Sequence, residues 1–120
     1  MEIQFDIVSE EMTEREVAAL ARELNGALAR RHDVESIKPV SAPAPEGTKG
    51  IVEVIGSFLV GLPVEAITGA LDVIKTIASR PGQPPFTMKI TRDTTEVSFD
   101  PRRITPEEVA TLAKRLRPPD

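Results

Sequence analysis

The chain has 120 residues, of which 40% are hydrophobic and 28% are charged, and these values are typical of one globular domain rather than of a disordered segment. Its net charge of −4 and its 3% of aromatic residues argue against nucleic-acid binding, which depends on basic surfaces and stacking aromatics. The sequence contains no cysteine, which excludes disulfides and thiolate metal sites and is consistent with a reducing cytoplasm.

The beginning of the chain predicts a strand followed by a helix. Residues 2–8 alternate between apolar and polar side chains, which is the period-two pattern of a half-buried strand. The acidic residues there are unlike the basic start of a secretory signal. A capping box of Thr13 and Glu16 begins the helix, and its apolar side chains recur every three or four residues as far as Leu28. We therefore expect a cytoplasmic protein that opens with a β-α unit.

A second strand and a loop are predicted next. Residues 34–40 form the strand, and Pro39 within it suits a position at a sheet edge. The following segment, residues 41–50, is rich in proline, glycine and alanine, so it predicts a flexible loop. This loop is too short to separate two domains, and we expect a single domain over residues 1–120.

Residues 51–79 predict two apolar helices. The first is apolar apart from Glu53 and Ser57, and Pro63 breaks or kinks it. In the second, residues 64–79, the polar side chains form one narrow stripe at helical spacing, so most of the circumference is apolar. Because such a helix is usually buried on several sides, we interpret the two as an apolar central helical pair.

A β-hairpin and a last helix are predicted at the end of the chain. Residues 86–90 and 95–99 alternate and are joined by a short turn. Thr105, Pro106 and Glu108 supply the N-cap, the first-turn proline and the capping-box acid of the helix. The predicted order is β-α-β-α-α-β-β-α, and about four strands with helices indicate an α+β fold, a two-layer sandwich.

Few side chains are suited to catalysis. Nucleophilic catalysis needs an activated nucleophile beside a base, and the one histidine, His32, lies among arginines at a predicted helix end. Paired acids such as Glu107 and Glu108 lie at a predicted helix start, where they complement the helix dipole. The segment from Glu46 to Gly50 lacks the full spacing of a phosphate-binding loop. We therefore expect no enzymatic activity, no metal and no cofactor, with a small-molecule site in this loop as a remaining alternative.

The apolar surface of residues 51–79 predicts a protein partner. Two helices this apolar are hard to bury against four short strands, and surplus apolar surface marks interfaces. Small or polar residues at i, i+4 and i+8 would let another helix approach closely, although packing within the domain explains the same spacing. We expect the partner-binding residues to be Glu53, Ser57, Gly61, Glu65, Leu71, Asp72 and Ile74.

The expected partner is an effector protein or a second copy of this chain, and a membrane is an alternative. The charges within residues 51–77 oppose a single spanning helix, because each costs about 2.5–3.5 kcal/mol at the bilayer centre. A central helical hairpin that inserts on activation stays open as an alternative. Nucleic acid is not an expected partner.

The layout of three segments matches that of a known family. A proline-rich loop with a small glycine motif (PAPEGTKG) leads into an apolar segment with glycines (GSFLVGLPVEAITGAL), and the last helix follows a D-x-R-like turn (FDPRRITPEEV). This layout spans nearly the whole chain and resembles the effector-associated constant component one family, small cytoplasmic proteins of bacterial conflict systems. The resemblance implies a non-catalytic adaptor encoded beside an effector such as a caspase-like or trypsin-like peptidase. The chain departs from the family pattern at Asp93-Thr94, where Asp-Gly is expected, and in the ending IASR of its apolar helix.

Overall fold

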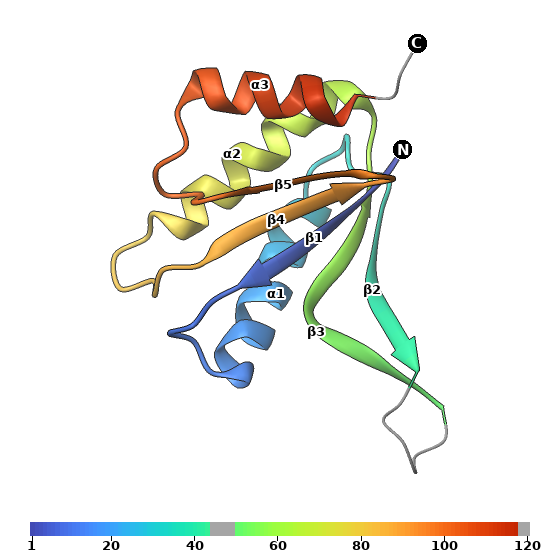
Figure 1. Cartoon of the computed structure of the whole chain (residues 1–120), viewed down its shortest axis with the longest axis vertical. Coiled ribbons are helices and arrows are strands. Elements are labelled where there is room, and N and C mark those ends of the chain that lie inside the picture. Colours follow the sequence, from blue (N-terminus) through green and yellow to red (C-terminus); the bar gives the residue numbers. More distant parts are fainter. Residues whose placement is uncertain (44–49, 118–120) are drawn as a thin grey trace.

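The computed structural model describes residues 1–43 and 50–117 and consists of a five-stranded antiparallel sheet covered by helices (Figure 1). In chain order the elements are β1 (Glu2–Val8), α1 (Glu14–Ala29), β2 (Ser36–Pro43), β3 (Ile51–Gly61), the 3₁₀ helix η1 (Val64–Ala66), α2 (Ile67–Ala78), β4 (Thr87–Arg92), β5 (Thr95–Phe99) and α3 (Pro106–Leu116). The predicted α+β class is confirmed. The sheet has five strands where we expected about four, and the predicted element order is corrected accordingly.

The strands follow the order β2-β3-β1-β4-β5, and every neighbouring pair is antiparallel. The central strand β1 sets the register, because Phe5 lies opposite Phe58 of β3 on one side and Ile90 of β4 on the other. From β1 to β4 this is the split βαβ arrangement, also called ferredoxin-like. Here β5 extends one edge of the sheet, and α3 follows it. This arrangement hosts many unrelated functions, so it indicates none by itself.

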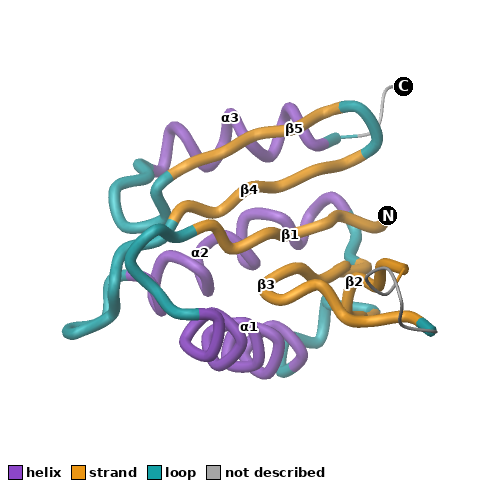
Figure 2. Tube along the Cα trace, turned by 60° about the horizontal axis from the view of Figure 1, so that its bottom comes forward, coloured by secondary structure: helices purple, strands orange, loops and turns teal. Residues whose placement is uncertain are grey.

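The three α-helices form a second layer over one face of the sheet (Figure 2). Alternate strand residues point into this layer, and the rings of Phe5 and Phe58 pack there with their centroids 5.5 Å apart. The helices contribute the other half of the core through one apolar stripe each. The side chains that are less than 2% exposed include Ile3, Leu24, Leu28, Phe58, Val60, Leu62, Leu71, Ile74, Met88, Ile90 and Leu116.

Both predicted capping boxes are present. At the start of α1 the amide of Glu16 donates to Thr13 Oγ1 at 3.2 Å, and the amide of Thr13 donates to Glu16 Oε1 at 3.1 Å. Thr105 and Glu108 make the same pair of bonds at the start of α3, at 3.2 and 3.3 Å. Local sequence therefore defines both helix starts, because each motif satisfies two backbone donors that the helix leaves free.

The predicted first central helix is wrong, because residues 51–61 form strand β3. This strand lies between β2 and β1, and its residues Phe58 and Val60 face the core. Its other face carries Leu59, which is only half-buried. A strand that is apolar on both faces shows no period-two alternation, so periodicity cannot separate it from a buried helix. The many Ile and Val residues of the segment favour a strand over a helix.

The second predicted helix is confirmed in part. Pro63 precedes η1, and the regular helix α2 covers Ile67–Ala78. The expected apolar central helical pair is therefore one strand and one helix. The alternative of a helical hairpin that inserts into a membrane loses its first helix for the same reason.

Strands β2 and β3 continue beyond the rest of the sheet as a two-stranded arm (Figure 1). Strand β1 pairs with β3 only at residues 57–61, whereas β2 pairs with β3 as far as Pro43 and Ile51. A register shift follows Pro39, and Gly56 has a φ of 82°. The predicted strand 34–40 is thus longer than expected, and it takes up the first residues of the predicted loop. Residues 44–49, with most of the loop considered for small-molecule binding, lie outside the described residues.

The predicted C-terminal hairpin is confirmed as β4 and β5. Asp93 and Thr94 form its two-residue turn, and Asp93 has a φ of 52°. Aspartate tolerates this left-handed conformation better than most residues, which explains how the turn closes without glycine.

Candidate interaction site

The three predicted partner-binding residues of the first half of the segment lie on β3 rather than on a helix. The hydroxyl of Ser57 donates to Asp6 Oδ1 of β1 at 2.5 Å. Gly61 lies opposite Glu2 and Ser36 and is buried. The backbone of Glu53 pairs with that of Ser41 in the two-stranded arm. These residues therefore hold the sheet together and do not form a helical surface for a partner.

The four predicted residues of the second half are divided between core and surface. Leu71 and Ile74 are 1% and 0% exposed, so they belong to the core and cannot contact a partner. Glu65 and Asp72 are exposed on the 3₁₀ helix and on α2. The structure therefore does not bring the seven predicted residues together on one face.

Asp72 of α2 lies near an ion pair in the turn that follows α1. Arg31 donates to both carboxylate oxygens of Asp33, at 2.9 and 2.8 Å. This hydrogen bonding raises the pKa of Arg31 and lowers the pKa of Asp33, and the charge of Asp72 raises the pKa of Arg31 further. A Cβ atom at Gly69 would overlap the Arg31 guanidinium. The glycine in α2 thus makes room for an arginine of the same chain.

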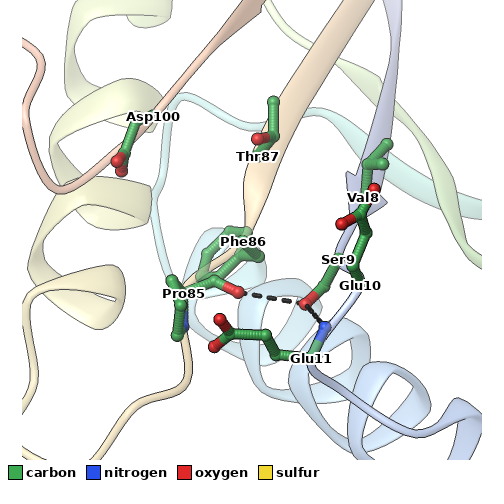
Figure 3. Close-up of a pocket in the computed structure, with 8 residues that line it drawn as sticks. All are labelled: Val8, Ser9, Glu10, Glu11, Pro85, Phe86, Thr87 and Asp100. Carbon is green, nitrogen blue, oxygen red and sulfur yellow. Dashed lines mark hydrogen bonds between the residues drawn. The ribbon is translucent and has the colours of Figure 1, made fainter.

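A pocket lies at the end of β1, and hydrogen bonds of Ser9 join the two loops that form it (Figure 3). Ser9 Oγ donates to the carbonyl of Pro85 at 3.0 Å and accepts from the amides of Glu11 and Met12 at 3.2 Å. The hydroxyl therefore joins two loops through three hydrogen bonds. The pocket has a volume of about 310 Å³, and its carboxylates are those of Glu10, Glu11 and Asp100.

Within residues 1–43 and 50–117, no three His, Asp or Glu side chains gather where they could hold a metal ion. The single histidine, His32, is exposed. None of the helices that the structure describes is long and apolar enough to cross a membrane.

The sheet face opposite the helices is polar, and its charges pair within the sheet. Lys38 lies 3.6 Å from Glu2, and Lys89 lies 3.4 Å from Glu96. Proteins that bind RNA on a four-stranded sheet of this kind stack bases on aromatic side chains there. The four phenylalanines are the only aromatic residues of this chain, and each is buried or turned toward the helical layer. They are Phe5, Phe58, Phe86 and Phe99.

The edge strand β5 presents unpaired backbone groups. Because the hairpin turn has two residues, Arg92 and Thr95 form a hydrogen-bonded pair, and such pairs alternate along an antiparallel ladder. Val97 is therefore bonded to β4, whereas the N–H and C=O groups of Glu96 and Ser98 point away from the sheet. Outside the sheet ladder, no backbone hydrogen bond among the described residues involves either of these two residues. The edge thus offers two donors and two acceptors in the spacing that an added strand requires.

A groove runs between this edge and α3. It has a volume of about 260 Å³, and its apolar residues are Phe99, which is half-buried, and Leu112, which is buried. Exposed polar side chains of α3 form its rim. The rim residues are Glu107, Glu108, Thr111 and Arg115.

The opposite edge of the sheet is protected against strand addition. Strand β2 contains Pro39, Lys38 and a register shift, and these are features with which proteins block edge pairing. Strand β5 has the sequence TEVSF, without proline, lysine or bulge. The two edges therefore differ in the way expected if one edge binds an extended segment and the other does not.

The residues of the β5 groove were absent from the predicted site. The sequence does predict β5 and α3, and the lack of proline and lysine in TEVSF is visible in it. Which strands lie at the edges follows from the strand order, which only the tertiary structure gives. Comparison of the chain with protein-family models, curated proteins and solved structures finds no match.

Proposed function

We propose that this chain is a non-catalytic protein-interaction module that binds an extended segment of a protein partner by adding it as a strand to β5. The observation that carries the proposal is the unpaired backbone of Glu96 and Ser98 beside the groove formed with α3. In this mode of recognition, main-chain hydrogen bonds provide affinity and pockets for alternate side chains provide specificity.

The position of α3 favours a segment of a different protein over a second copy of this chain. In Figure 2, α3 runs alongside β5 in the helical layer behind the sheet. Neighbouring strands lie about 4.8 Å apart, whereas packed helices need about 8–10 Å between their axes. Two copies paired antiparallel through β5 would place their α3 helices next to each other on the same side of the joint sheet, where two helices need more room than two strands. A single extended segment without a covering helix has no such conflict.

The resemblance to the effector-associated constant component one family supports a role as a cytoplasmic adaptor of a bacterial conflict system. In that role the partner is an effector such as a caspase-like or trypsin-like peptidase. We take the bound segment to be an extended loop or linker of the effector, because a β edge binds an extended chain. The adaptor then acts by capturing one extended segment of the effector.

The test uses two variants of Ser98, whose outward N–H would donate to the partner. Ser98→Pro removes this donor, and proline is tolerated on an edge strand where the N–H faces solvent. Leaving the partner carbonyl unpaired costs about 1–3 kcal/mol, or roughly 5- to 150-fold in Kd. Ser98→Ala keeps the N–H and is the matched control.

Light scattering and titration calorimetry with the effector encoded by the neighbouring gene provide the measurement. We expect a complex with the wild-type chain and with Ser98→Ala, and a much weaker one with Ser98→Pro. Circular dichroism checks that the proline variant is folded. A complex that is insensitive to Ser98→Pro, or no complex at all, contradicts the proposal.

A further inference from the structure

The groove beside β5 has opposite charges at its two ends. Six residues connect β5 to α3, and α3 runs back along the strand in the opposite direction (Figure 1). Glu107 and Glu108 therefore lie toward the Phe99 end of β5, and Arg115 lies toward the Thr95 end. All three charged residues are exposed and line the groove. A bound segment would thus meet negative charge at one end and positive charge at the other.

The register of the edge decides which residues of the segment face the groove. A residue opposite Glu96 or Ser98 would lie on the polar face of the sheet, because paired residues share a face. A residue opposite Val97 or Phe99 would face α3. Side chains at every second position of the segment therefore enter the groove, where Leu112 provides an apolar contact.

The direction of the added strand follows from the rest of the sheet. All four strand pairs of this sheet are antiparallel, and antiparallel pairing is the more stable per residue. The N-terminal part of an antiparallel segment would lie at the Phe99 end, beside Glu107. Its C-terminal part would lie at the Thr95 end, beside Arg115.

We infer that the β5 groove selects an extended, antiparallel segment with a basic, then an aliphatic, then an acidic residue at alternate positions. This inference rests on the proposed function and specifies the partner's chemistry. The basic residue pairs with Glu107, the aliphatic residue packs near Leu112 opposite Val97, and the acidic residue pairs with Arg115. A segment bound parallel to β5 would need the reverse order of charges, so the preferred order reports the direction of binding.

The experiment compares two capped heptapeptides, SKSVSES and its charge-reversed form SESVSKS, by NMR titration of the ¹⁵N-labelled chain at low salt. The first peptide would form two favourable ion pairs with the groove, whereas the reversed peptide would meet two like charges. At an exposed site this difference changes the Kd about tenfold. We expect the first peptide to bind the wild-type chain about tenfold more tightly. The amides of Glu96 and Ser98 should shift and become protected from hydrogen exchange, while that of Val97 is protected before and after binding.

A charge-swapped groove supplies the decisive comparison. In the double variant Glu107→Lys and Arg115→Glu, the preference should shift in favour of SESVSKS by less than tenfold, because Glu108 keeps its negative charge and its capping role at the Phe99 end. The control is Lys114→Glu, which makes the same charge change as Arg115→Glu at an exposed neighbour that does not line the groove. It should leave the preference for SKSVSES unchanged.

Each outcome separates this inference from the proposed function. If both peptides protect Glu96 and Ser98 with equal affinity, the inference fails and strand addition stands. A wild-type preference for SESVSKS overturns the antiparallel assignment. If these amides are protected without peptide and lose protection on dilution, the occupant is a second copy, which overturns the inference as well. If neither peptide affects the two amides, the proposed function fails too.

Discussion

Replacing Gly56 with alanine tests the geometry by which β3 packs against α1. Gly56 has a φ of 82°, and a Cβ atom there would lie 2.7 Å from Val17 Cγ1. The left-handed backbone alone costs a non-glycine residue about 1–2 kcal/mol. Forcing an extra methyl group into a packed core costs about 1–3 kcal/mol more. We therefore expect Gly56→Ala to lower the free energy of unfolding by about 2–5 kcal/mol.

Two other glycines separate these contributions. Gly82 has nearly the same φ, 81°, but nothing lies within 4 Å of its Cβ position, so Gly82→Ala should cost only the backbone strain of about 1–2 kcal/mol. Gly26 lies in the interior of α1, without positive φ and with open space around it. Gly26→Ala should therefore stabilise the chain by about 0.5–1 kcal/mol.

Denaturant unfolding followed by circular dichroism measures all three variants. The expected order of stability is Gly26→Ala above wild type, then Gly82→Ala, then Gly56→Ala. Equal losses for Gly56→Ala and Gly82→Ala would show that the contact with Val17 is absent, and the described packing of β3 on α1 would then be wrong. A loss for Gly26→Ala would refute its assignment to an open helical position.

Three further predictions concern the core, the surface and a helix end. Ile74 is fully buried, so Ile74→Ala should lower the free energy of unfolding by about 2–5 kcal/mol and Ile74→Val by about 0.5–1.5 kcal/mol. Denaturant unfolding measures both variants. A decrease below about 0.5 kcal/mol for Ile74→Ala would place this side chain at the surface. The hydrogen bond and charge of Arg80 lower the pKa of Glu23. The stability that this pair contributes is therefore present at neutral pH and is lost as the pH falls through the lowered pKa. Thermal unfolding between pH 7 and pH 3 should show this loss in the wild type and not in Glu23→Gln, and parallel pH profiles would argue against it. Thr105→Ala should lower the free energy of unfolding by about 1 kcal/mol, because it removes the N-cap of α3. Thr111→Ala in the same helix should leave this free energy almost unchanged. Equal effects of the two substitutions would contradict the capping role of Thr105.

The β5 edge is a different kind of interface from the one that the sequence predicts. The predicted interface is an apolar helical surface, and two of its residues, Leu71 and Ile74, belong to the core. The proposed interface uses backbone groups that every sequence possesses, together with a few side chains of α3. A β edge suits an adaptor, because it binds an extended segment mainly through main-chain hydrogen bonds.

The arm formed by β2 and β3 is a second exposed feature. Val54 and Ile55 are 38% and 50% exposed there, and Val8 at the end of β1 is 51% exposed. Single exposed apolar residues are common on monomeric proteins. The edge strand β5 has a defined set of bonding groups and a groove, and it is therefore the more specific site.

Several elements can be read from the sequence, because local chemistry defines where they begin and end. Thr13 with Glu16 and Thr105 with Glu108 begin their helices because the capping bonds join residues three apart. The alternation of β1, β4 and β5 is readable because each has one face in the core and one in solvent. The scarcity of catalytic side chains is likewise a property of composition.

The conformation of residues 51–61 and the position of the candidate site depend on tertiary packing and cannot be read from the sequence. Strand β3 lies between β2 and β1, and its two largely apolar faces conceal the alternation that marks a strand. The open edge at β5 depends on the order β2-β3-β1-β4-β5, which results from long-range packing of the helices on one face. That strand order brings Glu96, Ser98 and Arg115 to the same edge of the sheet. Their proximity depends on contacts between distant parts of the chain.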